Sequence, residues 1–107
     1  MSFNHYQLAR IHELAKNCKD PDLLQLLNEW RAINNVLISR VFNDDSLNSE
    51  MEAHPDCPKS AYAADSVKYG KFTDSELERK SDILLRIINN RIRKRPDLNC
   101  STLSLKN

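Results

Sequence analysis

A histidine and a cysteine, His54 and Cys57, stand three residues apart between two prolines. Imidazole nitrogen and thiolate sulfur are ligands that Zn²⁺ prefers, and a closed structural zinc site needs four such ligands. The remaining candidates are scattered along the chain, with no second pair at short spacing: His5, His12, Cys18 and Cys100. The sequence therefore predicts no metal site, and it places His54 in a loop beside an unreactive or partly buried thiol.

Groupings typical of catalysis are not indicated either. Cys57 has carboxylates as near neighbours in the chain, and these oppose the lowered pKa that a nucleophilic thiol needs. The adjacent Asp44 and Asp45 lie in a segment with too few apolar residues to desolvate them, as acid–base catalysis by such a pair requires. A single glycine excludes a glycine-rich phosphate loop and a dinucleotide fingerprint. We expect a protein that is not an enzyme and has no cofactor.

Positive charge gathers near the C-terminal end of the chain. Between Asp82 and Asp97 there are five cations and no carboxylate: Arg86, Arg91, Arg93, Lys94 and Arg95. Such a cluster can neutralise phosphates or contact an acidic partner. However, basic residues at the end of a helix are also what the helix dipole favours. No aromatic residue is interleaved with them to stack on bases, and the net charge of the chain is only +1.

The middle of the chain is acidic. Residues 44–56 carry five carboxylates and no Lys or Arg, whereas residues 84–107 have a net charge of +5. These poles can pair within one monomer, pair between two copies, or steer a charged partner. The candidate residues for a protein contact are Asp44, Asp45, Glu50, Glu52 and Trp30, of which Trp30 fits a core position better.

Two helices near the N-terminus have recognisable start signals. Asn4 predicts a helix over about 5–17, because its side chain can accept an amide hydrogen bond from the first turn. Asp20–Pro21 predicts a helix over about 21–42, since aspartate caps a helix and proline fits the first helical position. The second helix has a broad apolar surface, so we expect it to be central and to contact more than one neighbour. Any part of this apolar surface that stays exposed would be an interface for a partner protein or a second copy of the chain.

A third long helix is predicted before Pro96. Thr73 and Glu76 form a capping-box pattern, and the helix is expected to run to about Lys94. The expected apolar face of this helix is Leu77, Leu84, Ile88 and Ile92 with Ile83, Leu85 and Ile87.

Two short helices are also indicated. The first spans 46–53 and ends at His54, because a residue before proline avoids the helical region. The second spans 59–69, with Gly70 as a left-handed terminator.

Two ten-residue segments, 31–40 and 86–95, match at five positions with a constant offset, and each contains a pair of asparagines. Asparagine is unfavourable in mid-helix because its amide competes with the backbone for hydrogen bonds. The paired asparagines are interpreted as solvent-facing residues, or as amides presented to a partner.

Leu, Ile, Val and Phe together make up 27 of 107 residues, enough for a folded core. The scarcity of glycine argues against a sandwich or barrel with glycine-punctuated turns. We predict an all-α fold, a small antiparallel helical bundle of three main helices plus one or two short ones. Residues 1–96 form the single domain, with an acidic connection at about 43–58, and residues 97–107 form a loosely held tail.

The expected compartment is the cytoplasm. There is no secretory signal pattern and no apolar run long enough to span a membrane, and three scattered cysteines are not a disulfide framework. We expect a small regulatory protein, such as an adaptor, inhibitor or regulatory subunit, that binds another protein or forms a homodimer. The alternative is a nucleic-acid-binding regulator that uses the basic helix end. Small size and the lack of catalytic features also fit a bacterial or phage accessory protein.

Overall fold

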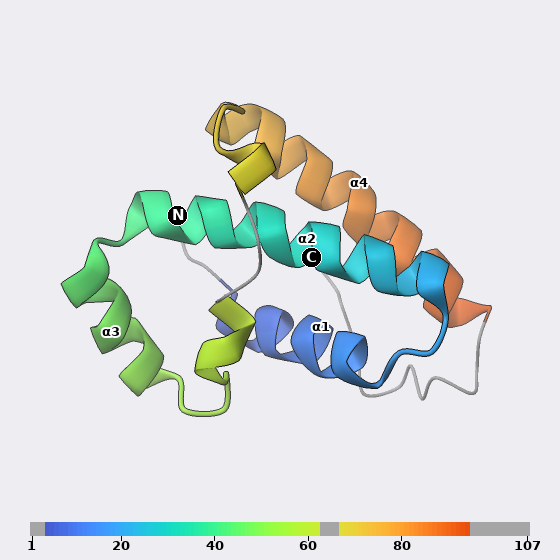
Figure 1. Ribbon diagram of the computed structural model, residues 1–107, viewed down its shortest axis with the longest axis horizontal. Coiled ribbons are helices and arrows are strands. Elements are labelled where there is room, and N and C mark those ends of the chain that lie inside the picture. The colour runs from blue at the N-terminus through green and yellow to red at the C-terminus, as the bar shows by residue number, and fades with distance from the viewer. Residues whose placement is uncertain (1–3, 63–66, 95–107) are drawn as a thin grey trace.

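The computed structural model describes residues 4–62 and 67–94, and this part of the chain is helical with no strand (Figure 1). The all-α prediction is thereby confirmed. In chain order the elements are α1 (His5–Asn17), α2 (Pro21–Val41), α3 (Asp44–Ala53), the 3₁₀ turns η1 (Lys59–Tyr62) and η2 (Val67–Tyr69), and α4 (Asp74–Arg93). The predicted tail at 97–107 lies outside the described residues.

The predicted caps of the first two long helices are present. Asn4 Oδ1 accepts a hydrogen bond of 2.9 Å from the amide of Gln7. Asp20 Oδ1 accepts one of 3.0 Å from the amide of Asp22 and a longer one from that of Leu23. These bonds satisfy amides that have no partner inside the helix, which is why α1 and α2 begin where the sequence indicates.

The capping box predicted for α4 is also present. Thr73 Oγ1 accepts from the amide of Glu76, and Glu76 Oε1 accepts from the amide of Thr73 at 3.0 Å. Arg40, near the end of α2, donates to Asp74 Oδ1 at 2.6 Å and to the carbonyl of Gly70 at 2.9 Å. The start of α4 is therefore tied to the end of α2.

The segment between α2 and α4 differs from expectation at two points. α3 begins at Asp44 rather than at residue 46, because Asn43 Oδ1 caps it by accepting from the amide of Ser46 at 2.8 Å. The helix predicted over 59–69 is wrong, since the described ends of that range form the separate turns η1 and η2. Each turn buries only one side chain, which is too little apolar contact to support an α-helix there.

Gly70 closes η2 without a left-handed conformation. Its amide donates to the carbonyl of Val67 at 3.2 Å, and its φ lies outside the positive range that favours glycine. A Cβ at this position would meet the Val67 oxygen at 3.4 Å, an ordinary van der Waals distance. The predicted role of Gly70 as a left-handed terminator is therefore wrong.

α2 is the central helix and contacts both α1 and α4, as its broad apolar surface predicts (Figure 1). One buried cluster joins Leu23, Leu27 and Trp30 of α2 to side chains of α1 and of the second half of α4. A second cluster joins the later turns of α2 to Leu77 of α4 and to Tyr69 of η2. The apolar surface of α2 is thus largely used inside the molecule.

The first asparagine pair lies inside the protein. Asn34 is 9% exposed and Asn35 is 5% exposed. Asn34 Nδ2 donates to the Trp30 carbonyl at 2.9 Å and to Ser81 Oγ of α4 at 3.0 Å. Asn35 Nδ2 donates to the carbonyl of Ala61 in η1 at 3.1 Å. For this pair, the interpretation as solvent-facing or partner-facing amides is wrong, because the amides connect α2 to its neighbours.

Candidate functional site

The predicted basic cluster lies on the last turns of α4. Arg86, Arg91, Arg93 and Lys94 are all exposed there, while Arg95 lies outside the described residues. The helix therefore presents these cations to solvent at one end of the molecule.

Two apolar residues of α4 point outward among these cations. Ile83 is 48% exposed and Ile87 is 38% exposed, so the prediction that they belong to the buried face is wrong. The buried line of α4 is Leu77, Ser81, Leu85, Ile88 and Ile92. With 3.6 residues per turn, successive residues are turned by about 100°, so Ile83 and Ile87 fall on the side of α4 away from that line, although Ile88 next to Ile87 is buried.

The exposed isoleucines stand among basic side chains. Each of these cations is three, four or seven residues from Ile83 or Ile87, and all are exposed: Arg79, Lys80, Arg86, Arg91 and Lys94. Residues at these spacings share one side of a helix. We call this surface, formed by the two isoleucines and these five cations, the α4 outer face. It combines an apolar centre with a mainly cationic surround, in which Glu76, seven residues before Ile83, is the exposed carboxylate at these spacings.

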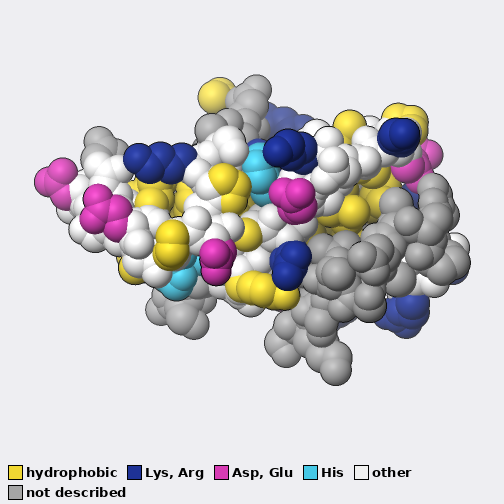
Figure 2. Space-filling view, turned by 90° about the horizontal axis from the view of Figure 1, so that it is seen from below, with side chains coloured by type: hydrophobic (Ala, Val, Ile, Leu, Met, Phe, Trp, Pro, Cys, Tyr) yellow, Lys and Arg dark blue, Asp and Glu magenta, His cyan; other side chains and the backbone are white. Residues whose placement is uncertain are grey.

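The predicted acidic residues lie elsewhere, on α3. Asp45 and Glu52 are exposed and Glu50 is partly buried, while the side chain of Asp44 is not among those described. α3 and the C-terminal end of α4 lie at opposite ends of the view in Figure 1, and Figure 2 shows acidic side chains at the left end of the lower face. Among the described residues, no ion pair joins α3 to the basic end of α4.

Trp30 is the one predicted contact residue that lies in the core. Its side chain is 2% exposed and packs among residues of α1, α2 and α4. The indole is therefore not accessible to a partner of the folded monomer.

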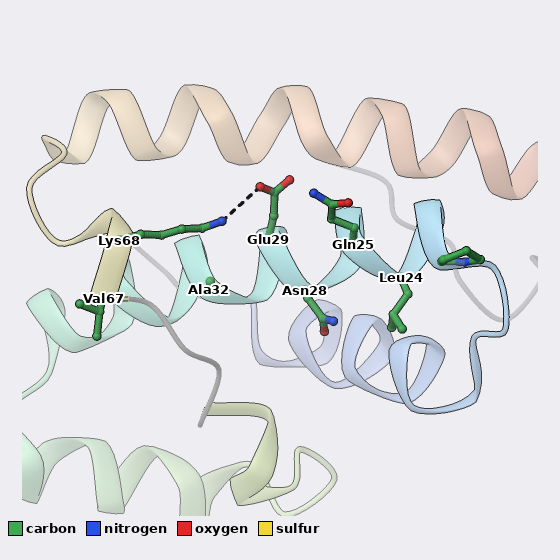
Figure 3. A pocket seen from close by; sticks show the side chains of 8 residues that line it. Leu24, Gln25, Asn28, Glu29, Ala32, Val67 and Lys68 are labelled. Atoms are coloured by element: carbon green, nitrogen blue, oxygen red, sulfur yellow. Dashed lines mark hydrogen bonds and ion pairs between the residues drawn. The ribbon is translucent and has the colours of Figure 1, made fainter.

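An open groove runs along α2 next to η2 (Figure 3). It has a volume of about 650 Å³, and its lining is Pro21, Leu24, Gln25, Asn28, Glu29, Ala32, Val67 and Lys68. Lys68 Nζ and Glu29 Oε1 are 3.5 Å apart, and the hydroxyl of Tyr69 donates to the same carboxylate at 3.1 Å. The two charged side chains of the lining, Lys68 and Glu29, are thus paired with each other.

A cluster of potential metal ligands lies between the start of α1 and the end of α3, where His5, Glu50 and His54 come together. One nitrogen or oxygen atom of each lies within 4.8 Å of the corresponding atoms of the other two. His5 Nε2 is 3.4 Å from Glu50 Oε1, and the rings of His5 and His54 stack with centroids 4.0 Å apart. Burial lowers the pKa of His5, and the adjacent His54 lowers it further.

Cys57 is not a member of this cluster. Its side chain is 5% exposed within the core, and burial raises the pKa of its thiol, with a hydrogen bond to Tyr62 acting in the opposite direction. His54 therefore lies with His5 and Glu50, and not with the cysteine three residues after it. The buried, unreactive thiol agrees with the prediction for Cys57.

The sequence holds one signal for this cluster. Glu50 and His54 are four residues apart, and at that spacing two side chains share one side of a helix. His5 lies far away in sequence, so its place beside them depends on how α1 and α3 pack.

The remaining histidine, His12, contacts η1. His12 Nε2 lies 3.0 Å from Ser60 Oγ. Burial lowers the pKa of His12 below its ordinary value of 6.5, and the positive charge of Arg31 lowers it further; Glu13 raises it, and Lys16 lowers it. The folded protein therefore favours neutral His12.

Acidification is expected to destabilise the protein in part through His12. Because the unfolded chain takes up this proton at a higher pH than the folded chain, the stabilisation is complete above pH 6.5 and is lost as the pH falls from 6.5 toward the lower folded pKa. Urea midpoints measured between about pH 7.5 and about pH 5 should fall less steeply for His12→Gln than for the wild type. Parallel profiles of urea midpoint against pH for the two proteins would show that His12 does not contribute to the pH dependence of stability.

The fold and these surfaces define a small all-helical protein, and no helix within the described residues is long and apolar enough to cross a membrane. No known protein family matches the chain, and neither a curated protein nor a solved structure is similar to it.

Proposed function

We propose that this is a non-enzymatic cytoplasmic regulatory protein that binds another protein through the α4 outer face. The partner surface is complementary, with an apolar centre and carboxylates around it. The observation that carries the proposal is the exposure of Ile83 and Ile87 in the middle of the cations of α4.

The combination of apolar and charged groups is what favours a protein partner. Exposed apolar side chains gain free energy when a partner removes them from water, and the surrounding cations steer and orient an acidic partner. A phosphate backbone offers nothing comparable to two isoleucines, and no aromatic side chain stands among the cations to stack on bases. Protein contact therefore accounts for both parts of the surface.

The proposal includes the arrangement of the three long helices as an antiparallel bundle. Its support is the pairing of α2 with α4, since Arg40 contacts Asp74 while Asn34 contacts Ser81. Earlier residues of α2 therefore contact later residues of α4. In this arrangement the buried side of α4 is held by α2, which leaves the outer face for a partner.

Partner capture is expected to depend on the two isoleucines. The tagged full chain, used as bait in native lysate, should retain a specific protein, and Ile83→Glu/Ile87→Glu should lose it because carboxylates replace the apolar centre. With the purified partner, calorimetry should show affinity lowered more than about 10-fold, which corresponds to about 1.4 kcal/mol.

Val41 provides a matched control, because its side chain is 51% exposed but it lies at the end of α2 rather than on the α4 outer face. Val41→Glu should capture the same protein as the wild type. Retention of that protein by the double isoleucine variant would contradict the proposed face. If the bait recovers only further copies of itself in an isoleucine-dependent way, the partner is a second copy of this chain.

The alternative function, nucleic-acid binding, makes a different prediction. Retention of the wild type on DNA or RNA at about 50 mM salt, lost on changing Arg91, Arg93 and Arg95 to Gln, would favour it. If Ile83→Glu/Ile87→Glu is still retained on DNA or RNA, nucleic-acid binding is favoured further, because phosphate contacts do not need the isoleucines.

A further inference from the structure

We propose that His5, Glu50 and His54 bind one Zn²⁺ ion, or a similar divalent transition metal, between α1 and α3. Two imidazoles and one carboxylate form a recognised set of zinc ligands, and imidazole favours zinc, copper and nickel over Mg²⁺ and Ca²⁺. The proposal does not depend on the α4 outer face, because its ligands lie on α1 and α3.

The distances within the cluster suit a tetrahedral ion. His5 Nε2 and Glu50 Oε1 are 3.4 Å apart. Two ligand atoms that each bind Zn²⁺ at about 2.0–2.1 Å in tetrahedral geometry stand about 3.4 Å from one another. The first two ligands therefore already have the spacing that the ion needs.

The orientation of the His5 ring is fixed by its burial and by a hydrogen bond to Tyr62, which lies outside the cluster. Its ring is 4% exposed, and its Nδ1 is 2.6 Å from the hydroxyl of Tyr62 in η1. When the other nitrogen binds a metal, Nδ1–H donates to the Tyr62 oxygen. Hydrogen bonds of this kind hold metal-binding histidines in the correct tautomer and orientation. Tyr62 is therefore a positioning residue for His5.

His54 completes the site by a movement of its side chain. It is exposed and caps the C-terminal end of α3. Its ring stacks on His5 at an interplanar angle of 16°, and nearly parallel rings cannot direct their lone pairs at one ion. Binding therefore turns the exposed His54 ring out of the stack while His5 and Glu50 stay in place. A fourth position is left for water or a ligand from another molecule.

The ion would fasten α3 to the body of the protein. α3, which bears the acidic residues, packs less closely against the rest of the protein than the other helices do. It takes part in none of the larger helix–helix contacts. His5, in contrast, is the buried first residue of α1. A metal bridge between them therefore sets the position of the acidic helix, and binding energy for the ion is added to the stability of the folded state.

Isothermal titration of the chelator-treated full chain with Zn²⁺ tests the proposal. We expect one ion per chain for the wild type. His54→Ala and Glu50→Gln should each lower the affinity more than about 100-fold, and Tyr62→Phe should lower it about 10- to 100-fold, the range measured for groups that orient a ligand. Co²⁺ in place of Zn²⁺ should give the strong visible absorption of a four-coordinate site in the wild type, and His54→Ala should remove it.

Two controls separate this site from other donors of the chain. His12→Ala removes a histidine of α1 outside the cluster, and Cys18→Ser removes a partly buried thiol; both should bind Zn²⁺ as the wild type does. Far-UV circular dichroism verifies folding, and the variants at the exposed His54 and partly buried Glu50 avoid the risk of unfolding at the buried His5. Absence of Zn²⁺ binding by the wild type would overturn the proposal, as would equal binding by folded His54→Ala and Glu50→Gln.

Discussion

Trp30→Ala is expected to lower the free energy of unfolding by about 3–5 kcal/mol, the cost typical of truncating a large buried aromatic side chain. The indole is 2% exposed and lies in the cluster where α1, α2 and α4 meet. Because a domain of this size is typically stable by about 5–15 kcal/mol, this loss is expected to remove a large share of its stability. Urea unfolding followed by circular dichroism measures the change.

Trp30→Phe is the matched control. No described residue accepts a hydrogen bond from the buried indole Nε1. Phenylalanine keeps an aromatic ring and removes this N–H, whose burial without an acceptor costs about 1–3 kcal/mol, so the loss should be much smaller than for alanine. Equal losses for the two variants would contradict this explanation. A loss below about 1 kcal/mol for Trp30→Ala would contradict the core position itself.

The second large effect is expected at the buried amide of Asn34. Asn34→Ala should lower the free energy of unfolding by about 1–3 kcal/mol, because it removes the donor to the Trp30 carbonyl and to Ser81 Oγ. Ser81 is itself 9% exposed, so its hydroxyl has little access to water as a replacement partner. Urea unfolding again provides the measurement.

A double-mutant cycle isolates the contact between the helices. Asn34→Ala and Ser81→Ala should be non-additive by about 0.5–3 kcal/mol, since each removes the same hydrogen bond. Asn90→Ala is the control, because Asn90 occupies an exposed position in the corresponding asparagine pair of α4; it should change stability by no more than about 0.5 kcal/mol. Additive effects would show that the bond does not stabilise the packing of α2 on α4.

The core position of Trp30 agrees with the sequence-based expectation, whereas the burial of Asn34 does not. Asn35 and Asn90 occupy equivalent positions in the two asparagine pairs, yet Asn35 is buried and Asn90 is exposed. The difference arises because α2 is covered on two sides, by α1 and α4, whereas α4 is covered by α2. Ile83 and Ile87 illustrate the reverse case, in which apolar residue type predicts burial but the angular position on α4 leads to exposure.

The candidate metal site, too, could be predicted from the sequence only in part. Glu50 and His54 share one side of α3 by virtue of their spacing, and that part was available from the sequence. The third ligand, His5, and the tyrosine that orients it come from the two other segments that pack there. Spacing within one helix cannot indicate which residue of a distant helix will face it.

The sequence by itself determined the all-helical class and the starts of α1, α2 and α4. These depend on interactions within a few residues, such as the Asn4, Asp20 and Thr73 caps, whose hydrogen bonds the local chain can specify alone. Only the tertiary structure decided that Asn34 links two helices, that Ile83 and Ile87 face solvent, and that His5 meets His54. Each of these outcomes depends on which face of one helix another helix covers, and that choice is made by the packing of the whole chain.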